Sequence, residues 1–195
     1  MNPGKAREIT ALLAGLPLDV VTLAAVPGAT LPPETGATYA ENALIKARAA
    51  ARLTGALCLG DDSGLEVDAL GGAPGLFSAR YGGPGLDDAG RCARLLEALR
   101  DVPDAARTAR FRCVVAVVDP GRAERVVEGV AEGRIARAPS GAGGFGYDPI
   151  FVFPPLGRTF AELTDAEKSG VSHRGRALRE ARRVLEEWLR AGGFT

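Results

Sequence analysis

The stretch TYAENALIKARAAARLTGALCLGDDSG, residues 38–64, carries the strongest local signals for the fold. Thr38 and Glu41 have the spacing of a capping box, which predicts the start of a helix, and Gly55 is placed to end it. The apolar face of this helix would comprise Ala40, Ala43, Leu44, Ala47 and Ala51. The short apolar run 56–60 then predicts a buried strand that ends at Asp61-Asp62-Ser63-Gly64. The stretch therefore predicts a helix and then a strand, with two carboxylates where the strand ends.

Signals of the same kind predict helices and strands on both sides of this stretch. We expect helices over 3–13, 38–54, 87–99 and 175–190, and strands over 18–23, 56–60, 108–118, 124–136 and 151–152. The sequence Asp119-Pro120-Gly121 predicts a turn between two of these strands. The chain contains no repeat and no linker-like segment, so we expect a single α/β domain over residues 1–195 with a mixed sheet.

The composition excludes several classes of function. Lys plus Arg and Asp plus Glu both number 24, so no net field favours nucleic acid or an anionic membrane. No apolar run is long enough for a transmembrane helix, and the first residues lack the apolar core of a signal peptide. The single histidine, His173, excludes a His-rich metal site, so a metal would need carboxylate ligands, which favours Mg²⁺ or Mn²⁺. The three cysteines suit reduced core residues of a cytosolic protein.

The acidic pair Asp61-Asp62 suits a hard cation if a rigid strand presents it, although an Asp-rich turn is the alternative. Glu34 and Glu41 could add oxygen ligands. We rank Glu34 first, because Glu41 already has a structural role in the capping box. Lys5 lies in the first turn of a helix, where backbone N–H groups and the helix dipole favour a phosphate.

The loop Gly141-Ala-Gly-Gly-Phe-Gly-Tyr-Asp148 suits a flat ligand. Phe145 and Tyr147 offer ring faces for stacking, and Asp148 offers an acceptor for ring N–H donors. Donors for phosphate or carbonyl oxygens follow at Lys168, His173 and Arg174. A glycine-rich turn without a ligand is the alternative.

Together these segments resemble the inosine/xanthosine triphosphate pyrophosphatases, which hydrolyse non-standard purine nucleoside triphosphates. The resemblance covers nearly the whole chain. It is carried by Asn2-x-x-Lys5, the block from Glu34 to Lys46, the block from Asp61 to Asp68, Leu70-Gly-Gly-Ala-Pro-Gly75, Ser78-Ala-Arg-Tyr81, Gly143-Gly-Phe-Gly-Tyr-Asp-Pro149, Glu167-Lys-Ser169 and Ser172-His-Arg174.

The resemblance implies an elongated, two-lobed α/β fold with its site in the cleft between the lobes, and a homodimer. It implies Mg²⁺-dependent attack of water on the α-phosphate of ITP, dITP or XTP, giving the monophosphate and pyrophosphate. Asp62 would be the catalytic carboxylate and a metal ligand with Glu34 and Glu41. The residues expected to bind substrate are Asn2, Lys5, Lys46, Ser63 and Lys168 toward the triphosphate, and Phe145, Gly146, Tyr147, Asp148, His173 and Arg174 toward the purine.

One departure from the family pattern concerns the N-terminus. The family places a strand and a Thr or Ser ahead of the Asn of its first motif, whereas only Met1 precedes Asn2 here. We expect the natural chain to start upstream. Two alternatives to the main hypothesis stay open. One is a nucleotide-binding protein without activity, and the other is a related pyrophosphatase for pyrimidine or modified nucleotides. We also expect the segment 70–77 to contribute to a dimer contact.

Overall fold

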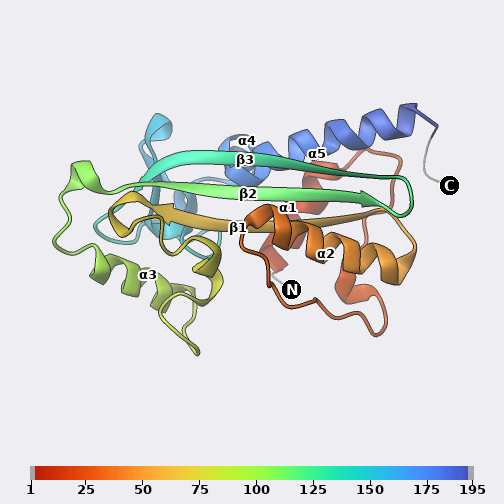
Figure 1. The fold of residues 1–195 in the computed structure, drawn as a ribbon. Helices are drawn as coiled ribbons and strands as arrows, with labels where there is room; N and C mark the ends of the chain where they lie inside the picture. Colours follow the sequence, from red (N-terminus) through yellow and green to blue (C-terminus); the bar gives the residue numbers. More distant parts are fainter. Residues whose placement is uncertain (1–2, 193–195) are drawn as a thin grey trace. The chain divides into compact units, whose positions relative to one another are not determined.

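The computed structural model describes residues 3–192, which form two compact units built from discontinuous segments (Figure 1). The first unit comprises residues 3–62, 113–129 and 174–192. The second unit comprises Ser63–Arg112 and Val130–His173. The unit boundaries fall inside strands and at the start of a helix, so no linker separates the units in the sequence.

A five-stranded sheet provides the framework, and its strand order follows the sequence. The strands are β1 (Cys58–Val67), β2 (Thr108–Asp119), β3 (Ala123–Ile135), β4 (Phe151–Phe153) and β5 (Arg158–Thr159). β1 and β2 run in opposite directions (Figure 1), β2 and β3 are joined by a tight turn at 120–122, and both β3–β4 and β4–β5 pair antiparallel. The prediction of a mixed sheet is therefore wrong. Neighbouring strands joined in sequence order pair antiparallel, whereas parallel neighbours need a crossover connection.

The first unit packs three helices against its segments of strand: α1 (Pro3–Leu13), α2 (Tyr39–Thr54) and most of α5 (His173–Arg190). Its core contains Leu13, Cys113, Val115, Val117, Ala177, Leu178, Ala181 and Leu185, all buried. Leu178, Ala181 and Leu185 lie on one face of α5 and are fully buried, and the helix expected over 175–190 is confirmed.

Small residues let α2 approach β1 closely. Ala43 and Ala47 are fully buried, and a Cβ at Gly60 of β1 would lie 2.4 Å from the Ala43 carbonyl oxygen and 2.7 Å from the Ala47 nitrogen. Only glycine fits at this crossing. The close approach allows neighbouring side chains of α2 to reach polar groups of β1.

The second unit contains α3 (Asp88–Ala98), α4 (Asp165–Val171), β4, β5 and a larger aromatic core. Phe111 packs against Phe151 with ring centroids 4.6 Å apart and stacks on His173 at 4.5 Å. The core also includes Leu65, Val67, Leu95, Leu99, Ile135, Tyr147, Ile150, Phe153 and Phe160.

Three elements differ from the sequence-based expectation. The predicted strand 18–23 is wrong. Residues 19–22 have no regular structure and pair with no strand in the described part of the chain, and Val21 is 66% exposed. β1 does not end at the acidic pair but continues to Val67, and α4 was not predicted. The helices that the structure describes contain none with the length and apolar character needed to span a bilayer.

Candidate active site

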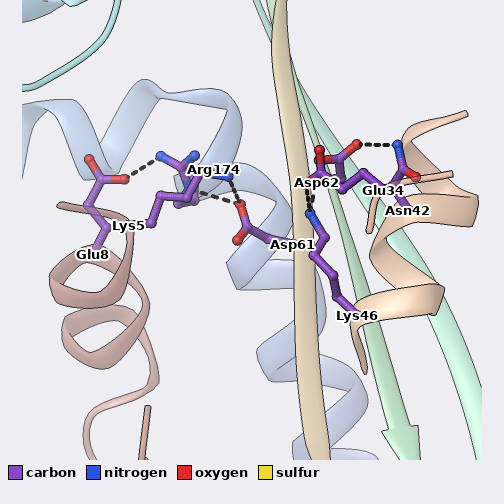
Figure 2. A network of polar contacts seen from close by, with 8 residues as sticks. All are labelled: Lys5, Glu8, Glu34, Asn42, Lys46, Asp61, Asp62 and Arg174. Carbon is purple, nitrogen blue, oxygen red and sulfur yellow. Dashed lines mark hydrogen bonds and ion pairs between the residues drawn. The ribbon is translucent and has the colours of Figure 1, made fainter. Parts of the chain in front are cut away.

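The first unit carries a cluster of charged side chains on both sides of β1 (Figure 2). Asp61 and Asp62 are consecutive in this strand, so their side chains point to opposite faces. Asp61 faces α1 and the start of α5, and Asp62 faces α2 (Figure 2). The two carboxylates therefore belong to two different sets of contacts.

Asp62 is held by two residues of α2. Lys46 Nζ lies 3.0 Å from Asp62 Oδ1, and Asn42 Nδ2 donates to Asp62 Oδ2 over 3.2 Å. Asn42 and Lys46 are four positions apart, so they share one face of the helix. Lys46 Nζ also donates to Glu34 Oε1 over 2.9 Å, which draws the loop before α2 toward the same point. The Asp62 residue is only 6% exposed, so its carboxylate has a fixed orientation.

The start of α2 fixes the loop that carries Glu34. Thr38 and Glu41 form the predicted capping box, and Glu41 Oε2 accepts from the Ala37 N–H at 2.6 Å and the Thr38 N–H at 3.2 Å. Asn42 Oδ1 accepts the Gly36 N–H at 2.8 Å. Glu41 therefore caps the helix, and the ranking of Glu34 above Glu41 as a metal ligand stays a prediction.

The donor set around Asp62 fits Mg²⁺. No three His, Cys, Asp or Glu side chains within residues 3–192 gather as a metal site. Mg²⁺ does not require such a cage, because it is commonly held by one or two carboxylates together with water and substrate phosphates. Asp62 and Glu34 already converge on one cation, the Lys46 ammonium. Burial by itself would lower the pKa of Lys46, but these two carboxylates raise it above its usual value.

The opposite face of β1 holds a second set of ion pairs. Lys5 Nζ lies 2.8 Å from Asp61 Oδ2, and Arg174 pairs with Glu8 at 2.6 Å and approaches Asp61 at 3.7 Å. Burial by itself would raise the pKa of the Asp61 carboxyl, but Lys5 and Arg174 hold that pKa well below its usual range. Two predicted substrate ligands, Lys5 and Arg174, are thus positioned by Asp61 and Glu8. The sequence analysis considered Asp61 only as part of a cation site and did not single out Glu8. The predicted ligand Asn2 lies outside the described residues.

The glycine-rich loop in the second unit is organised around Asp148, which is 2% exposed. Its Oδ2 accepts the Phe145 N–H at 2.8 Å and pairs with Lys168 Nζ at 2.7 Å. A Cβ at Gly144 would lie 2.1 Å from the same oxygen, and Gly144 has a φ of +70°. The chain therefore needs glycine here, both for the backbone conformation and for the space that Asp148 occupies.

The aromatic residues of this part of the site have unequal roles. Lys168 Nζ sits 4.6 Å from the Phe145 ring centroid, and Phe145 is half-buried. Tyr147 is 4% exposed and donates its hydroxyl to the Ser78 carbonyl oxygen over 2.8 Å. His173 is buried, stacks on Phe111 at 4.5 Å between ring centroids, and lies 6.5 Å from the Phe160 centroid. Tyr147 and His173 therefore support the site from the core, and their contact with a purine stays a prediction.

The predicted residues thus fall into two groups. Asp62, Lys46 and Glu34 meet in the first unit, as do Lys5 and Arg174, whereas Phe145, Asp148 and Lys168 meet in the second. Ser63 follows Asp62 in β1 and belongs to the second unit. The predicted cleft location stays a prediction. Asn42 was missed, although its position four residues before Lys46 is a sequence signal.

Comparison with known proteins gives consistent matches over nearly the whole chain. A model of the Ham1 family matches residues 1–184. A dITP/XTP pyrophosphatase of Geobacillus kaustophilus is 50% identical over 194 residues, covering 100% of this chain and 95% of the relative. The solved Ham1 protein from Coxiella burnetii superposes with a TM-score of 0.85 at 46% identity, covering 96% of this chain and 95% of that one. A solved dITP/XTP pyrophosphatase from Mycobacterium abscessus gives 0.74 at 50% identity, covering 92% and 94%.

Proposed function

The chain belongs to the Ham1 family, and from that premise we propose that it hydrolyses non-standard purine nucleoside triphosphates. The substrates would be ITP, dITP and XTP, and the products the nucleoside monophosphate and pyrophosphate. Relatives named dITP/XTP pyrophosphatase are 50% identical to this chain, which covers 95% of their length. The activity would remove deaminated purines from the nucleotide pool.

The single observation that carries the proposal is the setting of Asp62. Its carboxylate is fixed by Asn42 and Lys46 beside Glu34. Asp62 would accept a proton from water as the water oxygen forms a bond to the α-phosphorus. The bond from that phosphorus to the bridging oxygen then breaks, and pyrophosphate leaves with the electron pair. Lys46 and Lys5 would offset the negative charge on the phosphate oxygens.

We include Mg²⁺ in the proposal, with Asp62 and Glu34 as its protein ligands. When bound there, Mg²⁺ would neutralise phosphate charge and make water more acidic. Lys46 presently pairs with both carboxylates, so we expect its ammonium to turn toward the triphosphate when the ion and substrate are bound.

Base selection would depend on Asp148. A 6-keto purine carries N1–H, which a carboxylate accepts, whereas adenine presents a lone pair at N1 and an amino group at position 6. A fixed acceptor therefore favours hypoxanthine and xanthine and rejects adenine, because the mismatched polar groups remain unpaired. The bonds from Phe145 N–H and Lys168 fix this carboxylate in place.

The test is pyrophosphate release from a panel of ITP, dITP, XTP, ATP, GTP and pyrimidine triphosphates, with and without Mg²⁺. The proposal predicts rapid release from ITP, dITP and XTP and slow release from ATP, and it predicts release only with the metal. Nucleotide binding without pyrophosphate release would instead favour a binding protein. Preference for pyrimidine nucleotides would favour a pyrophosphatase of different specificity.

We further propose a homodimer in the cytoplasm, on the basis of the family resemblance. Phe77, in the apolar segment 70–77, is 60% exposed, and Arg80 lies over its ring at 4.9 Å from the centroid. The three cysteines are free thiols, as expected in a reducing compartment. Light scattering at micromolar protein tests the assembly, and a mass corresponding to one chain would rule out the dimer.

A further inference from the structure

The first two turns of α3 contact Gly146, in the glycine-rich loop 141–148, through both backbone polar groups of this glycine. Asp88 Oδ2 accepts the Gly146 N–H over 2.7 Å, and Cys92 Sγ donates to the Gly146 carbonyl oxygen over 3.3 Å. Asp88 and Cys92 are four positions apart, so they lie on the same face of the helix. Neither residue belongs to the motifs that carry the family resemblance.

Gly146 occupies a critical place in the loop. It has a φ of +62° and separates Phe145, whose N–H binds Asp148, from Tyr147, whose hydroxyl binds the Ser78 carbonyl oxygen. A change in the Gly146 peptide groups would therefore move both neighbours and, through them, the Asp148 carboxylate. The two contacts with α3 oppose such a change.

The Cys92 contact needs the protonated thiol. Burial, with help from Asp88 and Asp148, raises the pKa of Cys92 to about 11, so the sulfur keeps its hydrogen at neutral pH and can donate it. Cys92 is 3% exposed and belongs to the core of the second unit, whereas Gly146 is half-buried.

Helix capping does not account for the Asp88 contact. The N-cap of α3 is Asp87, whose Oδ1 accepts the Gly90 N–H at 2.8 Å. Asp88 places its other oxygen, Oδ1, 3.4 Å from Arg91. Arg91 therefore contacts one oxygen of the Asp88 carboxylate, and the other oxygen accepts from Gly146.

We propose that Asp88 and Cys92 are positioning residues for base selection, which act by fixing the peptide groups of Gly146 in the loop that carries Asp148. The inference rests on the proposed function, because it concerns how that activity distinguishes hypoxanthine from adenine. Asp88 and Cys92 would influence base selection without touching the nucleotide.

The experiment compares kcat/KM for ITP and for ATP, together with the Kd for IMP and for AMP, in matched pairs of variants. Asp88→Ala and Cys92→Ala remove an acceptor and a donor. Asp88→Asn keeps an acceptor at position 88, and Cys92→Ser keeps a donor at position 92. Leu99→Ala, a fully buried residue at the end of α3, serves as the control for general loss of stability. Thermal midpoints are measured for all.

We expect each Ala variant to lower the ITP/ATP ratio of kcat/KM by about fivefold or more, because small misplacements of a recognition group have large effects. The preference for binding IMP over AMP, measured from the two Kd values, should fall together with the ITP/ATP ratio. Asp88→Asn and Cys92→Ser should stay within about threefold of the wild type, and Leu99→Ala should lose stability but keep the ratio.

The outcomes separate this inference from the proposed function. A wild type that hydrolyses ITP selectively, together with Ala variants that keep its selectivity, overturns the inference alone. A fall in selectivity in Leu99→Ala equal to that of Asp88→Ala also overturns it, because general destabilisation would then explain the result. A wild type without ITP hydrolysis overturns the proposed function and this inference together.

Discussion

Asp61 and Asp62 are neighbours in β1, yet their carboxylates lie on opposite faces of the strand and contact different lysines (Figure 2). Asp61 pairs with Lys5 at 2.8 Å and Asp62 with Lys46 at 3.0 Å. One short stretch of strand thereby organises two sets of hydrogen-bond donors, Lys5 with Arg174 on one face and Lys46 with Asn42 on the other. Substitutions at the two positions should have different consequences, although the side chains are identical.

Asp62→Asn should abolish most turnover and leave the fold intact. The substitution keeps the size of the side chain but removes the charge that would accept a proton and hold the metal. We expect kcat to fall by about 10²-fold or more, as for groups that act in the transition state, while nucleotide still binds. Steady-state kinetics and calorimetric titration with ITP measure the two effects. Activity within about threefold of the wild type would refute the role of Asp62.

Asp61→Asn should instead weaken substrate binding and stability. The Asp61 side chain is 13% exposed and compensates Lys5 and Arg174, so its removal should cost about 3 kcal/mol, as when one partner of a buried ion pair is lost. Denaturant unfolding at pH 7 measures this cost. KM for ITP should rise, because the Lys5 ammonium is no longer held in place.

The same substitution gives a signed dependence of stability on pH. The pKa of Asp61 is depressed in the folded chain below the ordinary value of about 3.9 for an unfolded chain, so Asp61 contributes stability above that value. This contribution is lost as pH falls through the lower, folded pKa. The difference in unfolding free energy between wild type and Asp61→Asn should therefore be constant near neutrality and shrink below about pH 4. A difference that grows on acidification would contradict the assignment.

Asn42 is predicted to orient Asp62 and to restrain the Glu34 loop. It bonds Asp62 with its nitrogen and the Gly36 N–H with its oxygen. Asn42→Ala should lower kcat about tenfold with a smaller change in KM, because an orienting hydrogen bond is lost. Asn42→Asp restores an acceptor for Gly36 but places a carboxylate against Asp62. The acidic limb of its pH–rate profile should move to higher pH. If Asn42→Ala keeps the wild-type kcat and Asn42→Asp keeps the wild-type pH–rate profile, Asn42 does not orient Asp62.

Local signals account for the parts of the fold that the sequence predicted. The capping box at Thr38 and Glu41 and the cap at Gly55 are present as expected, because each depends on a few adjacent residues. The strand expected at 18–23 had only apolar β-formers in its favour, and strand formation depends on a neighbour to pair with. The capping box at Thr164 and Glu167 was also present in the sequence, but α4 is only seven residues long.

The extent of β1 was misjudged for a reason of longer range. Two consecutive carboxylates look like the end of a buried strand, since unpaired charge is costly to bury. The strand continues because Lys46 and Asn42, in α2, and Lys5 and Arg174, from opposite ends of the chain, compensate the charges. Such partners are known only once the chain is folded. Most site residues were singled out by their own chemistry, and the family motifs added Lys46, Ser63 and Gly146 and assigned the roles. The supporting contacts came from the structure.

The metal prediction can be tested with two glutamates that lie close in sequence but differ in their contacts. Glu34 shares the Lys46 ammonium with Asp62, whereas Glu41 caps α2 through backbone N–H groups. Each Glu→Gln change removes one negative charge and keeps an acceptor. Gln also satisfies a capping box, so Glu41→Gln should change neither stability nor metal affinity appreciably. Glu34→Gln should raise the Mg²⁺ concentration for half-maximal activity by about tenfold, because a carboxylate ligand is lost.

Calorimetric titration with Mn²⁺ in place of Mg²⁺ provides a readout independent of turnover and should show the same ranking. If Glu41→Gln weakens metal binding as much as Glu34→Gln does, the effect is one of general charge, and Glu34 is not a ligand.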